Sequence, residues 1–311
     1  MFRNKSLGSA AAENGVALVI AMLVVALASI LVATMLWREW GAIQRENEMR
    51  QNEQLRLALR GASDWAMHTL VARGNFSFEF LGLPGAGSGF PNYARRFVRP
   101  FSGKVNVRSG RAMMIYVEDL QSRFNLIDLA PNGVPMQGGN LVFSRLCVNM
   151  GLNCDFIPHL VSAVASDVAR GRYLHLRSAL EVEDNNPIHK SYLSGLSDYV
   201  TALPGFTKIN VNTAPRALLN AILAGGNCPP RLGADVRSPN FYSNISAFER
   251  SCGAKHLEPA ILTLLTTHSD YFLIVASIKK KSIVYVRKSL VFSSQGRINV
   301  LAASDYSFVD G

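Results

Sequence analysis

The sequence predicts an α+β protein with a membrane anchor, and three features of its 311 residues support this fold class. An uncharged apolar run occupies residues 16–37. Segments with the apolar spacing of helices follow one another between residues 140 and 267. Runs rich in β-branched and aromatic residues lie on both sides of that helical region. Because strands from both sides can pair in one sheet, we expect a β domain that is interrupted by an inserted, mostly helical domain.

The apolar run at residues 16–37 is long enough to cross a bilayer as one helix. It contains 22 residues without a charge, a proline or a glycine. At about 1.5 Å per residue, such a helix spans roughly 33 Å. A cleaved signal peptide has a shorter apolar core, and a helix buried in a soluble core rarely stays apolar on all sides. Residues 38–72 continue the helical pattern, so we expect the transmembrane helix to extend beyond the membrane.

The β domain is expected to comprise residues 73–130 and 268–311. Both segments contain runs of strand-forming residues bounded by turn residues. The last two runs are joined by a short connection with three lysines, which indicates a hairpin. The predicted strands are residues 113–117, 125–129, 271–278 and 283–292.

The inserted domain is expected to comprise residues 131–267. Its apolar residues recur at helical spacing, and clusters of glycine, proline and asparagine separate the segments. The predicted helices are residues 141–152, 156–169, 177–183, 215–223 and 259–268.

The net charge of +10 belongs mainly to the region after the apolar run. Such an excess attracts anionic lipid, nucleic acid or an acidic partner, but most often it is a solvated surface. Arg3 and Lys5 precede the run, and Arg38, Arg45 and Arg50 follow it. The positive-inside rule therefore does not decide the orientation of the helix.

Four cysteines lie far downstream of the anchor. An even number in an exported domain suggests disulfides. The pairing of sequence neighbours joins Cys147 to Cys154 and Cys228 to Cys252, which is one of three connectivities. The spacing lacks the paired C-x-x-C pattern of a zinc site, and free buried thiols are the remaining alternative.

Catalytic motifs are missing from the sequence. The six histidines are scattered, and none has a metal-binding spacing such as H-E-x-x-H. No G-x-S-x-G, P-loop or glycine-rich dinucleotide turn is present. We therefore expect a structural protein without catalytic residues rather than an enzyme.

A short polar leader with basic residues ends at Gly15, and the apolar helix begins at once at Val16. This junction resembles the type IV prepilin class. The resemblance implies that residues 1–15 are a leader, which a membrane peptidase removes after Gly15 on the cytoplasmic side before methylating Val16. It also implies a single-pass protein of the bacterial inner membrane, with a cytoplasmic N-terminus and a periplasmic C-terminal domain.

Members of the prepilin class usually carry glutamate at the position of Ile20. A lone carboxylate there would cost about 2.5 to 3.5 kcal/mol in the bilayer unless it were paired. In assembled filaments of that class, the glutamate pairs with the N-terminal amine of the neighbouring subunit. A subunit with no neighbour ahead needs no such glutamate, so Ile20 is typical of a subunit at the filament tip.

Three internal motifs resemble type II secretion system protein K, a large minor pseudopilin, and they occur in the same order. They are SRFNLIDL (residues 122–129), the segment containing INVNTAP (196–222) and SDYFLIVASI (269–278). The resemblance implies a pilin-like sheet with a helical insertion. It also implies that the protein caps the periplasmic pseudopilus and helps to initiate its assembly for the export of folded proteins. The implied partners are other minor pseudopilins, the major pseudopilin, the inner-membrane secretion platform and the prepilin peptidase.

Two other functions remain open from the sequence. A minor pilin of a type IV pilus would share the anchor and the pilin-like region. INVNTAP also resembles part of the helix-hairpin-helix DNA-binding module, although the Gly-Ile-Gly hairpin of that module is missing. We interpret INVNTAP as structural, with Asn212 or Thr213 capping the helix near Pro215.

Protein K relatives can bind calcium through an acidic loop, and calcium prefers six to eight clustered oxygen ligands. The corresponding stretch of this chain, residues 166–178, is basic and keeps only Asp167. Glu183 and Asp184 could add oxygens, but a helix end and turn is the preferred interpretation of that run. We expect no cofactor, and these three residues are the remaining calcium candidates.

Overall fold

The N-terminal apolar pattern folds as one long helix, α1 (Ala10–Ala72), in a computed structural model of the chain. The structure describes residues 10–72, 103–106, 112–171, 195–196, 198–224, 242–252, 257–294 and 296–309. The chain divides into two units, Met1–Ala58 and Leu59–Gly311. We describe each unit by itself.

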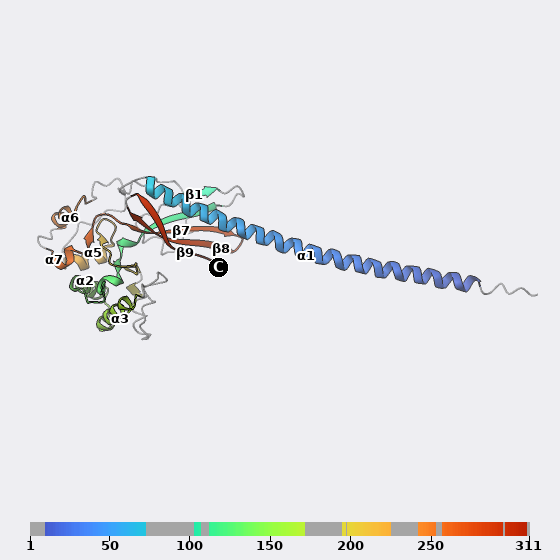
Figure 1. Cartoon of the computed structure of the whole chain (residues 1–311), viewed down its shortest axis with the longest axis horizontal. Coiled ribbons are helices and arrows are strands. Elements are labelled where there is room, and N and C mark those ends of the chain that lie inside the picture. The colour runs from blue at the N-terminus through green and yellow to red at the C-terminus, as the bar shows by residue number, and fades with distance from the viewer. Residues whose placement is uncertain are drawn as a thin grey trace, which may run out of the picture. The chain divides into compact units, whose positions relative to one another are not determined.

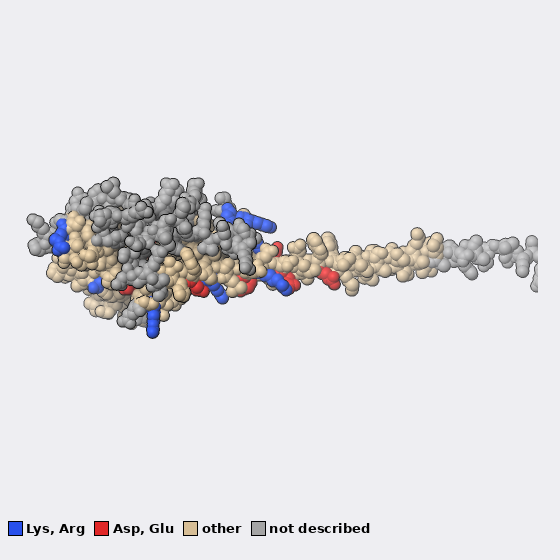
Figure 2. Space-filling view, turned by 90° about the horizontal axis from the view of Figure 1, so that it is seen from above, with Lys and Arg blue, Asp and Glu red and all other residues tan. Residues whose placement is uncertain are grey.

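The first unit is the N-terminal part of α1. Its side chains from Leu18 to Trp37 are exposed and uncharged, and this stretch is long and apolar enough to cross a membrane. Figure 2 shows a long part of this helix without charged residues. After Glu13, the next charged residue of the helix is Arg38. The apolar run and its charged continuation therefore form one uninterrupted helix, as the sequence predicts.

The second unit contains an antiparallel sheet (Figure 1). Within the described residues this sheet has five strands in the order β1-β2-β7-β8-β9. The strands are β1 (Gly103–Asn106), β2 (Ala112–Asp119), β7 (Tyr271–Lys280), β8 (Ile283–Ser294) and β9 (Arg297–Val309). Strands from before and after the helical region are therefore neighbours, because β2 pairs with β7.

The end of α1 packs on one face of this sheet. Val117, Ile274 and Ser289 are cross-strand neighbours, so their side chains share a face. Ser63 of α1 donates a hydrogen bond of 3.0 Å to Ser289 on that face. The buried residues of α1 recur at helical spacing, as expected for a helix with one side on a core. In the second unit they are Leu59, Ala62, Ser63, Ala66 and Leu70.

The helices between β2 and β7 form a separate hydrophobic core. Its largest buried side chains include Phe124, Phe143, Phe156 and Phe248. Phe143 contacts both Phe124 and Phe156 through its ring, with centroid distances of 5.4 and 6.3 Å. The helices are α2 (Gln137–Asn149), α3 (Ile157–Ala169), α5 (Arg216–Leu223), α6 (Ile245–Ser251) and α7 (Pro259–Leu262).

Short elements connect this core to the sheet. Each of two small sheets is a parallel pair of two-residue strands. The elements are η2 (Leu120–Ser122), β3 (Phe124–Asn125), η3 (Leu126–Leu129), β4 (Val200–Thr201), β5 (Ile209–Asn210) and β6 (Leu265–Thr266).

Two local predictions were wrong. The strand predicted at 125–129 is extended only at Asn125, the last residue of β3, and residues 126–129 form the 3-10 helix η3. The Asn125 side chain accepts a hydrogen bond from the Ile127 amide and starts this turn. Its four residues are buried in the helical core. The helix predicted at 259–268 ends at Leu262, because the following Leu265–Thr266 pairs with β5. The predicted helix at 177–183 lies outside the described residues. The α+β fold class is confirmed.

Candidate functional site

The predicted processing site lies in the helical part of the first unit. The backbone is helical from Ala10, so α1 runs through the Gly15–Val16 junction without a break. Ile20 is 58% exposed on this helix, within the apolar stretch. Gly15, Val16 and Ile20 therefore follow one another along a single helix.

Asp119 organises a buried cluster in the second unit, which we call the polar joint. Its side chain accepts hydrogen bonds from the Gln121 amide (2.9 Å) and from three side chains that come from two distant segments. These donors are Asn210 Nδ2 (3.3 Å), Thr213 Oγ1 (2.5 Å) and Ser269 Oγ (2.7 Å). Burial raises the pKa of the Asp119 carboxyl, and the four hydrogen bonds oppose this effect. The polar joint consists of Asp119, Gln121, Asn210, Thr213 and Ser269.

Gln121 connects the same three segments. Its Nε2 donates to the Lys208 carbonyl at 2.8 Å. Its Oε1 accepts from the amides of Asp270 and Tyr271, at 2.5 and 3.2 Å. The end of β2, the INVNTAP segment and the start of β7 are thereby held together at the junction of the sheet with the helical core.

A second pair, Asn125 and Asp128, anchors the loop before INVNTAP. Asn125 Oδ1 accepts from the Leu203 amide at 3.0 Å, and its Nδ2 donates to the Gly205 carbonyl at 2.9 Å. Asp128 Oδ1 accepts from the Thr207 amide at 3.0 Å. Burial raises the pKa of Asp128 well above its ordinary value of 3.8, partly offset by this hydrogen bond.

Glu118 lies at the same end of β2 and forms an ion pair with Arg123. Burial raises the pKa of Glu118, and the positive charge of Arg123 lowers it in part. The acidic pair Glu118 and Asp119 thus ends the strand without facing solvent. The carboxylates of this region bind other parts of the chain, which suits a structural role.

The structure brings together the three motifs that we singled out in the sequence. SRFNLIDL supplies Asn125 and Asp128, INVNTAP supplies Asn210 and Thr213, and SDYFLIVASI begins with Ser269. The sequence analysis missed Asp119 and Gln121, the residues that connect these motifs. The sequence signal for this place was the acidic pair Glu118 and Asp119 at the end of an apolar strand.

The capping role predicted for Asn212 or Thr213 was wrong. The N-cap of α5 is Pro215, and no side chain caps that helix. Thr213 instead binds Asp119, and Asn212 Nδ2 donates to the carbonyls of Tyr242 (3.1 Å) and Thr267 (2.9 Å). These polar groups of INVNTAP are therefore engaged inside the protein, and they give no support to the DNA-binding alternative.

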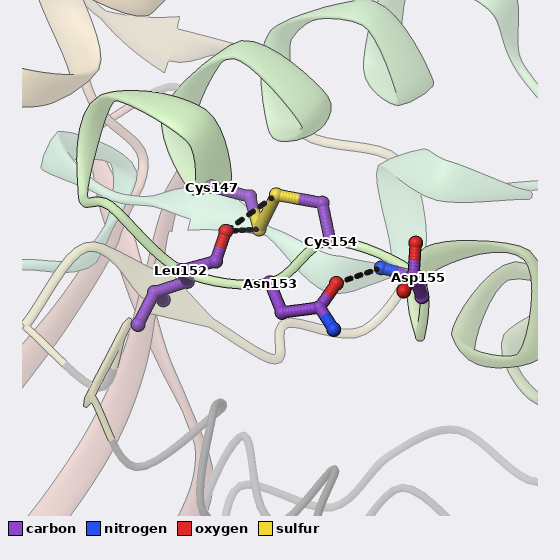
Figure 3. The surroundings of a disulfide bond; sticks show 5 residues. All are labelled: Cys147, Leu152, Asn153, Cys154 and Asp155. Carbon is purple, nitrogen blue, oxygen red and sulfur yellow. Dashed lines mark hydrogen bonds between the residues drawn. A yellow bond between two sulfur atoms is a disulfide. The ribbon is translucent and has the colours of Figure 1, made fainter.

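Cys147 and Cys154 form a disulfide between the end of α2 and the loop that leads to α3 (Figure 3). Their Cα atoms are 6.1 Å apart. The Leu152 carbonyl lies beside both sulfur atoms, and Asn153 Oδ1 accepts from the Asp155 amide at 3.0 Å. Cys252 is also disulfide-bonded, and Cys228 lies outside the described residues.

Of the three calcium candidates, the structure describes Asp167. Asp167 is buried and its Oδ1 lies 2.8 Å from Arg170 Nη2 in an ion pair. Glu183 and Asp184 lie outside the part of the chain that the structure describes. Within that part, no group of three or more acidic, histidine or cysteine side chains could hold a metal ion.

Comparisons with known proteins identify the fold. No protein-family model and no curated protein sequence matches the chain. Among solved structures, the chain is similar to a chain of the GspK-GspI-GspJ complex from the Type 2 Secretion System of enterotoxigenic Escherichia coli. The match covers 84% of this chain and 99% of that chain, with a TM-score of 0.53 and 16% sequence identity. This protein therefore has the α+β, pilin-like fold of a chain in that secretion complex.

Proposed function

We propose that this protein is a minor pseudopilin of a type II secretion system. It caps the tip of the periplasmic pseudopilus and helps to initiate its assembly for the export of folded proteins. The observation that carries the proposal is the shared fold, because the match covers 99% of a chain in the GspK-GspI-GspJ complex. The role is mechanical, and its partners are the minor pseudopilins that correspond to the other chains of that complex.

The anchor supports this proposal independently of the fold. An apolar helix near the N-terminus is long enough to span the inner membrane. The Gly15–Val16 junction at its start fits processing by a prepilin peptidase, which would leave Val16 as the methylated N-terminus. The leader would then face the cytoplasm, and the sheet and helical core would lie in the periplasm.

The tip position is supported by Ile20 and by the helical core. An apolar residue at position 20 requires no amine from a subunit ahead of it, whereas an unpaired carboxylate in the bilayer would cost about 2.5 to 3.5 kcal/mol. The helical core is inserted in the sequence between β2 and β7, and it makes the subunit larger than a sheet and anchor alone. A subunit of this size fits the end of a filament better than its repeating body.

The decisive experiment is to express the full chain with and without its prepilin peptidase and to measure the mature N-terminus by mass spectrometry. We expect loss of residues 1–15 and methylation of Val16 only when the peptidase is present. A Gly15→Leu variant is the control and should stay unprocessed in both strains. An intact N-terminus in the presence of the peptidase, or cleavage after Trp37, would contradict the proposal.

A second measurement tests the tip position. Quantitative mass spectrometry of sheared pseudopili should give far fewer copies of this chain than of the major pseudopilin, even when this chain is overproduced. A copy number that rises in proportion to expression would place the chain in the body of the filament.

A further inference from the structure

The C-terminal strand β9 is a long edge strand. It is 13 residues long and pairs with β8 through a regular register from Ala302 to Val309. Within the described residues, the other side of β9 has no partner strand. No strand of the described part of the chain occupies its outward backbone N–H and C=O groups, and an edge of this kind can pair with another extended chain.

The ladder of β8 and β9 has one register shift, between Leu290 and Val291, but from Ala302 to Val309 the edge lacks the bulges and prolines with which proteins usually protect such strands. It contains no proline, and Arg297 and Asp305 are its only charged residues. Asp305 is engaged by Arg287 of β8, with an Nη1–Oδ1 distance of 2.8 Å. Large apolar side chains instead point to solvent. Val300, Leu301, Tyr306, Phe308 and Val309 are each 43% to 71% exposed.

The regular part of the edge combines aromatic rings with positive charge. Tyr306 and Phe308 are stacked on the same face of β9, with ring centroids 6.4 Å apart. Lys288 Nζ lies 5.3 Å from the centre of the Tyr306 ring. From β7 to β9 the sequence contains six lysines and arginines but only one acidic residue, Asp305. An incoming chain therefore meets a surface that favours apolar and acidic side chains.

We propose that Ala302–Val309 of β9 is a docking edge for an extended segment of a neighbouring pseudopilin. That segment adds to the sheet as a further strand, with apolar side chains that meet Tyr306 and Phe308 and acidic side chains that meet Lys288. This proposal rests on the proposed function, because it assigns the surface through which one of the partners binds.

Two other occupants fit the edge less well. A lipid surface attracts aromatic and basic side chains, but acyl chains cannot satisfy the backbone groups of an edge strand. A second copy of this chain would bring two basic surfaces together, and like charges across an interface are unfavourable. An acidic and apolar strand satisfies the hydrogen bonds, the aromatic face and the charge together.

Photo-crosslinking in the host cells tests the proposal. The full chain would carry a benzoylphenylalanine at Tyr306, with Trp40 of α1 and Val148 of α2 as comparison positions. Val148 is 66% exposed and lies in the helical core region, so it controls for non-specific capture. We expect Tyr306, but not Val148, to crosslink to a protein with its own prepilin-type leader, at an extended segment that contains acidic residues.

The charge requirement is tested at Ser304, an exposed residue opposite Lys288 in the register. Ser304→Asp should neutralise Lys288 and lower the yield of the Tyr306 crosslink about tenfold, whereas Ser304→Lys should retain it. Both variants change the same exposed position, so a loss of fold caused by removing the Ser304 side chain would lower the crosslink in both. Equal yields in the two variants would overturn the proposed chemistry.

The comparison positions separate the two proposals. If Trp40 crosslinks to pilin-like proteins but Tyr306 does not, the docking edge is wrong and the proposed function stands. If neither position crosslinks to such proteins, the proposed function fails as well. Crosslinking of Tyr306 to lipid or to a second copy of this chain would overturn the docking edge.

Discussion

Thr213 donates a hydrogen bond of 2.5 Å to Asp119, although 94 positions of sequence separate the two residues. The bond joins INVNTAP to the end of β2, where the sheet meets the helical core. Ser269 and Asn210 donate to the same carboxylate oxygen. Three segments that are distant in sequence therefore depend on one buried acidic side chain.

Replacement of this carboxylate by an amide should destabilise the second unit. In Asp119→Asn one oxygen becomes an NH₂ group, and at the Oδ2 position this group cannot accept from Thr213, Ser269 or Asn210. A buried donor then loses its partner, so we expect the free energy of unfolding to fall by about 1–3 kcal/mol. Trp65 fluorescence during urea unfolding would measure this in the detergent-solubilised full chain, in a Trp37→Phe, Trp40→Phe background.

The matched control for this substitution is Asp64→Asn. Asp64 is exposed on α1, and exposed substitutions usually change stability by less than about 0.5 kcal/mol. Equal effects of the two variants would show that the polar joint adds nothing specific to stability.

Asp128 should make the second unit less stable as the pH rises. Burial raises its pKa well above 3.8 in the folded state, so the folded protein holds this proton more tightly than the unfolded chain. Between the two pKa values the unfolded state binds fewer protons, and the free energy of unfolding therefore falls with increasing pH. The stabilisation that comes from the tightly held proton of Asp128 is lost above the pKa of the folded state.

Asp128→Asn removes that charge while its Oδ1 can still accept from Thr207. We expect the variant to be at least as stable as the parent at pH 7, and its advantage to shrink toward pH 4. Urea unfolding of both proteins across this range would measure the difference. A constant difference at every pH would show that Asp128 does not titrate on unfolding.

Gly139 has no room for a side chain. An added Cβ would lie 2.0 Å from the Asp128 carbonyl oxygen, which belongs to backbone and cannot move aside cheaply. Gly139→Ala should therefore cost about 3 kcal/mol, as expected for overpacking. Thermal unfolding of the two proteins would show this as a lower midpoint.

Gly61 provides the opposite case. It lies in α1 and has no atom within 4 Å of an added Cβ. Gly61→Ala should gain about 0.5–1 kcal/mol, because alanine favours helix. If Gly61→Ala lowered the free energy of unfolding as much as Gly139→Ala, the contacts around Gly139 would not explain the destabilisation.

The parts of the fold that could be predicted are those in which local sequence decides the structure. Residues 16–37 form helix because the run is almost entirely apolar and contains no charge, proline or glycine. The prediction for residues 125–129 was wrong because their apolar run is typical of a buried strand. There the deciding factor was the Asn125 side chain, which starts a turn that the apolar pattern does not reveal.

The polar joint could be predicted only in part. The motif INVNTAP drew attention to Asn212 and Thr213, but local reasoning assigned them to a helix cap. Their partners, Asp119, Tyr242 and Thr267, lie between 30 and 94 positions away. Hydrogen bonds over such separations depend on how the elements pack, which a single sequence does not specify.

The Cys147–Cys154 disulfide should stabilise the helical core measurably, although it closes a short loop. Its cysteines are seven positions apart. Restriction of the unfolded chain by a loop of this size is worth about 2 kcal/mol in the chain-entropy description. A Cys147→Ser, Cys154→Ser double variant should therefore unfold at lower urea concentration, and Trp65 fluorescence would follow the transition. Reductant should lower the parent's midpoint further than the variant's, because only the parent contains this bond. Equal shifts in both proteins would assign the effect of reductant to Cys252 and its disulfide instead.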